Sequence, residues 1–269
     1  MKDLKLQIEA AYQAATLSAS DEAAVEHVMK LLEKGEVRVA EKANGQWTTH
    51  AWVKQAILLL FKVRKMEKME AGPFSWLDKI RVQNFELSQK VRTVPPSFVR
   101  EGAFISPTAV LMPSYVNVGA YVGKGTMVDT WATVGSCAQV GDNVHLSGGV
   151  GLGGVLEPLQ AEPVIIEDNV FVGSRCIVVE GVRVEEGAVL GAGVTLTKST
   201  KIIDVREKTA RTTIGVVPAR AVVIPGTVPK EFPAGTYQTP CALIIGTRSA
   251  QTDTKTSLNQ ALRDFEVSI

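Results

Sequence analysis

Aliphatic residues recur every six positions through the middle of the chain, from about Phe104 to Thr197. A proline-rich segment separates a first series from a second one. Glycine follows many of these positions, as at Gly123, Gly135 and Gly141. The two series are Phe104, Val110, Val116, Val122, Val128, Val134, Val140, Leu146 and Leu152, and then Ile166, Val172, Val178, Val184, Leu190 and Leu196.

This period predicts a parallel β-helix rather than an α-helix. On an α-helix, each step would rotate the apolar position by about 240°, so no apolar face would form. A short strand and a corner use about six residues, and repeats of fixed period indicate a solenoid. Residues eighteen apart should therefore stack, Val110 on Val128 and Val116 on Val134. A β-sandwich with chance spacing is the alternative, and fifteen regular positions argue against it.

The flanking segments have other patterns, so we expect a mainly β chain in three parts. Residues 1–97 are predicted to form an α-rich domain, with Ser20 capping its second helix and Asn44-Gly45 turning a hairpin. Residues 98–200 should form the β-helix, which is left-handed in known families of this repeat, with a protruding loop near 153–163. Residues 201–269 should add strands, near 221–224 and 241–245, and a terminal helix from about 253 to 265.

Composition limits the class of protein. The 29 basic and 28 acidic residues nearly cancel, which gives no support for a nucleic-acid or membrane partner. The first ten residues carry acidic side chains, unlike a signal peptide, and no apolar run approaches the roughly 20 residues of a membrane span. Cys137, Cys176 and Cys241 are too far apart for a metal pair. We expect a cytoplasmic protein without a metal.

The segment from Leu111 to Leu159 is more specific than a generic hexad repeat. Its block from Asp129 to Ser136, DTWATVGS, resembles the tetrahydrodipicolinate N-succinyltransferase family. The resemblance extends nearly to residue 245, and further matching segments are Val37–Lys42, Gly45–Trp47, Val91–Pro96, Ile165–Asn169 and Val178–Gly181.

The resemblance implies transfer of a succinyl group from succinyl-CoA to the amino nitrogen of tetrahydrodipicolinate, in the diaminopimelate and lysine pathway. Succinyl-CoA would be a co-substrate, with no permanently bound cofactor. A homotrimer would place active sites between neighbouring β-helices, with the pantetheine arm in a groove there.

The acceptor is a dicarboxylate, and a guanidinium grips a carboxylate through two parallel hydrogen bonds. Arg92 matches a substrate-binding arginine of the family, and Arg175 is a second candidate. Trp131 and Glu180 complete the expected substrate contacts. A surface ion pair is the alternative role for either arginine.

Amide formation needs a base, and two residues compete for that role. Asp129 matches the family's proposed acidic residue and stands where other hexads carry glycine, although an aspartate can also bond its own corner. His145 is the rival, because related O-acetyltransferases use a histidine, and a structural role is the alternative. Both assignments stay open at this point.

Backbone and basic groups are expected to bind the acyl-CoA. Amides near Ser147 and Gly148 could stabilise the thioester oxyanion. The candidates for the pantetheine amides are Gly191 and Ala192, and those for the phosphates are Lys198 and Arg220.

One position departs from the family pattern. Many relatives carry glutamate where this chain has Ile177, so either that glutamate is dispensable, or Glu180 or another group substitutes for it, or the donor or acceptor preference has shifted, for example to acetyl-CoA. Three readings compete with the succinyltransferase. A γ-class carbonic anhydrase needs three histidines at zinc, and only His145 lies in the repeat. An O-acetyltransferase leaves the Asp129 block unexplained. A binding scaffold would not need that block.

Overall fold

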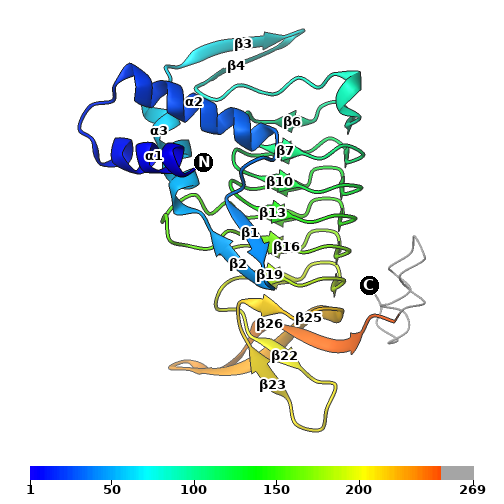
Figure 1. The fold of residues 1–269 in the computed structure, drawn as a ribbon. Coiled ribbons are helices and arrows are strands. Elements are labelled where there is room, and N and C mark those ends of the chain that lie inside the picture. The colour runs from blue at the N-terminus through cyan, green and yellow to red at the C-terminus, as the bar shows by residue number, and fades with distance from the viewer. Residues whose placement is uncertain (250–269) are drawn as a thin grey trace.

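The computed structural model describes residues 1–249, which form a three-sided parallel β-helix with a helical unit at one end and long antiparallel strands at the other (Figure 1). The mainly β fold class is confirmed. The expected terminal helix lies outside the described residues.

Short strands stack into three sheets, which the chain visits in turn. Sheet 1 consists of β6 (Phe98–Val99), β9 (Tyr115–Val116), β12 (Thr133–Val134), β15 (Gly151–Leu152), β18 (Ile177–Val178) and β21 (Thr195–Leu196). Sheet 2 consists of β7 (Phe104–Ile105), β10 (Tyr121–Val122), β13 (Gln139–Val140), β16 (Ile165–Ile166), β19 (Arg183–Val184) and β24 (Val216–Val217). Sheet 3 begins with β5 (Arg92–Thr93), β8 (Val110–Leu111), β11 (Met127–Val128), β14 (His145–Leu146), β17 (Phe171–Val172) and β20 (Val189–Leu190).

The second residue of each of these strands from β6 to β21 points into the prism and is buried, because a two-residue strand alternates its side chains. The predicted stacking of Val116 on Val134 and Leu152 is confirmed. The prediction for the start of the series was wrong. Ile105 and Leu111 point inward, whereas Phe104 and Val110 point outward and are half-buried.

The corner after Leu111 explains this error. It spans one residue fewer than the others, so Val128 pairs with Leu111 rather than with Val110. Extrapolating the six-residue period backward through this short corner placed the first two positions one residue too early.

The N-terminal unit packs three helices, α1 (Lys2–Gln13), α2 (Ala19–Glu33) and α3 (Ala51–Val63). Ser18, not Ser20, caps α2, because Ser18 Oγ accepts from the Asp21 N–H while Asp21 accepts from the Ser18 N–H. The expected hairpin is β1 (Ala40–Ala43) with β2 (Gln46–Thr49). A second hairpin, β3 (Glu67–Ala71) with β4 (Phe74–Asp78), was not predicted, and a 3-10 turn, η1 (Leu87–Gln89), follows it.

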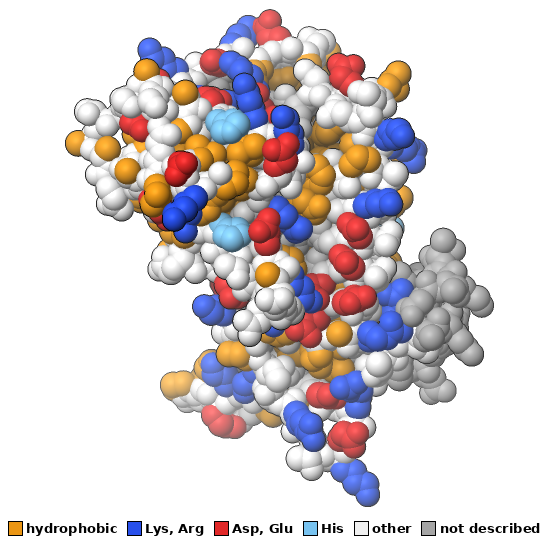
Figure 2. All heavy atoms as spheres, in the orientation of Figure 1, with side chains coloured by type: hydrophobic (Ala, Val, Ile, Leu, Met, Phe, Trp, Pro, Cys, Tyr) orange, Lys and Arg blue, Asp and Glu red, His pale blue; other side chains and the backbone are white. Residues whose placement is uncertain are grey.

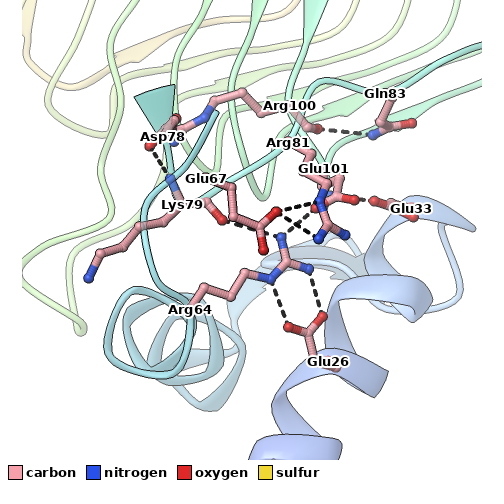
Figure 3. Close-up of polar contacts among 11 residues, drawn as sticks. Glu26, Glu33, Arg64, Glu67, Asp78, Lys79, Arg81, Gln83, Arg100 and Glu101 are labelled. Carbon is pink, nitrogen blue, oxygen red and sulfur yellow. Dashed lines mark hydrogen bonds and ion pairs between the residues drawn. The ribbon is translucent and has the colours of Figure 1, made fainter. Parts of the chain in front are cut away.

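Charged side chains join this unit to the first coil (Figure 3). Arg64, which follows α3, donates to both carboxylate oxygens of Glu26 at 2.7 and 2.6 Å and also pairs with Glu101 of the coil. Arg100 pairs with Asp78 of β4 at 2.5 Å. These contacts fix the helical unit against the start of the β-helix.

The first hairpin lies against sheet 2. Glu167 accepts from Lys42 Nζ at 2.9 Å and from Trp47 Nε1 at 2.7 Å. The Arg38 guanidinium stacks on the ring of Tyr121, 3.6 Å from its centroid. The N-terminal unit therefore covers sheet 2 and leaves the edge between sheets 3 and 1 accessible.

Two excursions interrupt the coils. Residues between Leu152 and Ile165 form no strand, and Lys54, fully buried in α3, donates to the Ala161 carbonyl of this loop at 2.6 Å. After β21 the chain forms β22 (Ile202–Asp204) and β23 (Arg211–Thr213), and it then returns for a last coil. The long strands β25 (Ala221–Phe232) and β26 (Gly235–Thr247) extend sheet 3 and contain both C-terminal strands that we predicted.

Candidate functional site

Most of the predicted site residues lie along one edge of the prism, where the chain turns from sheet 3 to sheet 1. We call residues 129–131, 147–149, 173–175 and 191–193 the open edge. The corners of successive coils stack because the strands on both sides pair in register. Seven predicted residues belong to this edge: Asp129, Trp131, Ser147, Gly148, Arg175, Gly191 and Ala192.

Asp129 and His145 face each other at this edge. Asp129 Oδ2 lies 4.0 Å from His145 Nε2, and each side chain is about one-third exposed. The other carboxylate oxygen, Oδ1, accepts from the Thr130 N–H at 2.6 Å and from its hydroxyl at 3.2 Å. Asp129 thus does bond its own corner, as the structural alternative expected, but only through one oxygen. The second oxygen stays available to a partner.

His145 points outward from β14 and lies between Met127 on β11 and Phe171 on β17. Its ring stacks on that of Phe171, with centroids 5.3 Å apart and planes 18° apart. Burial lowers the pKa of His145 below its ordinary value of 6.5, and the charge of Asp129 opposes part of this shift. The imidazole is therefore neutral near pH 7 and can accept a proton.

Trp131 and Arg175 present large side chains at the same edge. Trp131 is 67% exposed, and Arg175 is also exposed. The Arg175 side chain lies over Gly149, where a Cβ atom would come within 2.8 Å of it. Gly149 also has a φ of +71°, so glycine is required there for two reasons.

Three backbone N–H groups of the open edge lack an acceptor within residues 1–249. They belong to Gly148, Ser174 and Ala192. The N–H of Ser147 instead donates to the carbonyl of Val172, and the N–H of Gly191 donates to the carbonyl of Val223. Of the expected backbone donors, Gly148 and Ala192 can therefore bind a ligand, whereas the amides of Ser147 and Gly191 belong to the strand ladder.

The other predicted residues lie away from this edge. Arg92 is exposed on β5, in the outward column of sheet 3 that also contains His145. Three strand spacings separate them, about 14 Å. Glu180 and Lys198 lie at the corners between sheets 1 and 2, where Glu180 accepts from the Lys198 N–H at 3.1 Å. Arg220 donates to the Arg248 carbonyl at 3.2 and 2.9 Å.

Ile177 points outward from β18, just after the open edge. If Gly151 carried a Cβ atom, that atom would lie 2.9 Å from Cδ1 of Ile177. The isoleucine side chain therefore covers this glycine on the neighbouring strand. The side chain is 38% exposed. An apolar group thus occupies the surface where the family resemblance led us to expect a carboxylate.

Sequence reasoning missed Phe171 and Met127. A signal for Phe171 exists, because it directly precedes the inward-facing Val172 and so must point outward. Its distance of 26 residues from His145, rather than 18, includes the protruding loop and hid the stacking.

Neither metal chemistry nor a membrane span gains support from the described residues. Within residues 1–249, no group of three or more His, Cys, Asp or Glu side chains is arranged to hold a metal ion. Among the helices of this part of the chain, none combines the length and apolar character that crossing a bilayer requires.

Comparison with known proteins gives consistent matches. Residues 3–63 match the family model described as Tetrahydrodipicolinate N-succinyltransferase N-terminal, and residues 163–198 match Hexapeptide repeat of succinyl-transferase. A relative from Bordetella avium (strain 197N) is 50% identical over 97% of this chain and 98% of its own length. One from Bartonella quintana (strain Toulouse) is 54% identical over 89% of each chain. Both are named 2,3,4,5-tetrahydropyridine-2,6-dicarboxylate N-succinyltransferase.

A solved structure supports the fold. A Campylobacter jejuni protein, named as a candidate 2,3,4,5-tetrahydropyridine-2-carboxylate N-succinyltransferase, superposes with a TM-score of 0.53. Its sequence is 15% identical, and the match covers 85% of this chain and 63% of that chain.

Proposed function

We propose, since the chain belongs to the tetrahydrodipicolinate N-succinyltransferase family, that it transfers the succinyl group of succinyl-CoA to the amino nitrogen of tetrahydrodipicolinate at the open edge. Identity of 50% over nearly the full length of both chains makes it an acyl-CoA-dependent N-acyltransferase of the diaminopimelate and lysine pathway. The succinyl donor, the location of the site and the roles of its residues are our proposals.

The facing pair Asp129 and His145 carries the proposal. Two atoms 4.0 Å apart can both lie within hydrogen-bond distance, about 2.9 Å, of one nitrogen placed between them. The acceptor's amine would occupy that position. Asp129 Oδ2 would orient the N–H, and His145 Nε2 would take the proton as the nitrogen attacks the thioester carbonyl.

The remaining steps follow from the chemistry of a thioester. A C–N bond forms and the carbonyl oxygen gains negative charge, which the N–H of Gly148 would stabilise; one such donor is typically worth about 10²–10³ in rate. The C–S bond then breaks, and the proton held by His145 passes to the departing CoA thiolate. Asp129 would stabilise the imidazolium between these two steps.

Arginines and a tryptophan suit the dicarboxylate acceptor. Arg175 and Trp131 lie at the same edge as the Asp129–His145 pair, and both are exposed. Arg92 lies about two strand spacings, roughly 10 Å, from β11, so it would bind a carboxylate at the far end of the acceptor. We propose that a second copy in a homotrimer closes the site over these residues, because the N-terminal unit does not cover the open edge, which carries Arg175 and Trp131, and Arg92 on sheet 3 is exposed.

The acyl-CoA arm would follow the open edge toward the later coils. The N–H of Ala192 is available for a pantetheine carbonyl, and exposed Lys198 suits a phosphate. Gly191 would contribute shape rather than a hydrogen bond. Glu180 and Arg220 are bonded within the chain, so we leave them out of the proposed site.

The test is release of free CoA thiol with tetrahydrodipicolinate as the acceptor, measured with succinyl-CoA and with acetyl-CoA. We expect a higher kcat/KM with succinyl-CoA. Absence of turnover with both donors would contradict the proposal. A preference for acetyl-CoA would support the second candidate, an acetyltransferase, which the apolar side chain of Ile177 favours.

A further inference from the structure

The imidazole of His145 lies in a column of outward-facing side chains on sheet 3. Pairing places Met127 on one side of it and Phe171 on the other, one strand spacing away in each direction. The near-parallel stack with Phe171, 18° between ring planes, covers one face of the imidazole. Its Nε2 stays directed at Asp129 Oδ2.

Few charges act on this imidazole. The strand β11 brings Asp129, which directly follows it, and β17 brings no charged group before Arg175, whose side chain lies over Gly149. At the opposite end of these strands, Asp142 and Asp168 accept backbone N–H groups of neighbouring coils. The environment of His145 is therefore set by one carboxylate and two apolar side chains.

We propose that Phe171 is a positioning residue for the acyl transfer: its ring fixes the plane of His145 and excludes water from one face, so that a neutral imidazole presents Nε2 to the amine. This inference rests on the proposed function of the open edge. Burial lowers the pKa of His145 by more than the charge of Asp129 raises it. The proposal assigns this burial to the ring of Phe171.

A purely structural role for Phe171 is the competing explanation. The ring also packs against the buried Val189 and Val222, the next residues of the same column. A structural role predicts lower stability in a truncated variant, with an unchanged pH dependence of the remaining activity. The experiment must therefore measure titration rather than activity alone.

The direct readout is NMR titration of the full-length enzyme with ring-labelled histidine. The chain has three histidines, so the loss of one signal in His145→Gln assigns the resonance. Phe171→Ala should raise the pKa of His145 toward its ordinary value, whereas Phe171→Leu, which keeps an apolar cover, should retain most of the depression. Tyr115→Leu alters an outward aromatic side chain on sheet 1 and should leave the titration unchanged.

The pH dependence of kcat/KM supplies the functional readout. In Phe171→Ala the acid limb of the kcat/KM profile should move to higher pH together with the NMR titration. The decrease in kcat/KM from pH 8 to pH 6 should therefore be roughly 3- to 10-fold larger than in the wild type. An unchanged His145 titration in both Phe171 variants would overturn the proposal. So would a shifted titration with an unmoved acid limb. If no donor supports turnover, the proposed function fails, and the NMR titration still decides whether Phe171 sets the state of His145.

Discussion

Two edges of the same prism share a backbone geometry and differ in what satisfies their N–H groups. We call residues 123–125, 141–143, 167–169 and 185–187, where the chain turns from sheet 2 to sheet 3, the capped edge. There Asp142 accepts from the Lys124 N–H at 2.7 Å, and Asp168 accepts from the Asp142 N–H at 2.8 Å. Figure 2 shows acidic side chains in a row along the β-helix.

The open edge lacks this ladder. Gly148, Ser174 and Ala192 keep N–H groups without an acceptor within residues 1–249, and no side chain of the next coil reaches back to them. A corner N–H must bond to a side chain, water or a ligand. One edge therefore uses carboxylates to hold consecutive coils together and leaves only the Asp168 N–H without an acceptor within residues 1–249, whereas the open edge has no such ladder and leaves three donors available to a substrate.

Among the variants that distinguish the roles of the two edges, His145→Gln is expected to have the largest effect. Loss of the base should lower kcat/KM by about 10²–10⁴ with little change in thermal stability, because the side chain is about one-third exposed. Steady-state rates and a melting curve on the same sample measure both effects. A near-normal rate in the folded protein would transfer the role of base to Asp129, which Asp129→Asn then tests.

Arg92→Leu should have a smaller effect that is confined to the acceptor. A charge-assisted hydrogen bond contributes about 1.5–3 kcal/mol, so kcat/KM for tetrahydrodipicolinate should fall by roughly 10- to 100-fold, with KM for the acyl-CoA unchanged. Arg183→Leu is the matched control, since it removes an arginine from sheet 2, away from both substrates. Equal losses in the two variants would remove Arg92 from the site.

Glu167→Gln should show the opposite behaviour, with a small loss of stability and an unchanged rate. Glu167 accepts from Lys42, Trp47 and the Glu186 N–H, and the loss of the charged pair should cost about 1–2 kcal/mol because Lys42 is partly exposed. Melting temperature and kcat/KM at neutral pH measure this. A lowered kcat/KM would contradict the division of roles between the edges.

The same variant has a defined pH dependence. Burial raises the pKa of Glu167, but the hydrogen bonds from Lys42 and Trp47 lower it by more, so the pKa lies below the usual 4.5. Because the folded-state pKa is depressed, the stabilisation is complete above pH 4.5 and is lost as pH falls through the folded-state value. The stability difference between wild type and Glu167→Gln should therefore close in acid.

The repeat was readable from sequence because burial in a β-helix depends on a local period. Val116, Val134 and Leu152 stack as their spacing predicted. The error at Phe104 and Val110 arose where a corner is one residue shorter, and a pattern cannot show a corner's length before both of its strands are located. Ser18 rather than Ser20 caps α2, because the Ser18 side chain and the Asp21 carboxylate each accept a hydrogen bond from the other residue's backbone N–H. The apolar pattern of the helix follows both serines at similar spacing, so it did not distinguish them.

The amino-acid sequence alone determined the family, the fold and the corner positions of Asp129, Trp131 and Gly148, because these depend on local spacing and on residue type. Only the tertiary structure decided what touches them. The facing of Asp129 and His145 joins side chains of neighbouring coils, and the stacking of His145 on Phe171 also depends on a separation that includes the protruding loop. The availability of the Gly148 N–H was likewise undecided until the coils were paired, because a hydrogen bond depends on where the acceptor of the next coil lies.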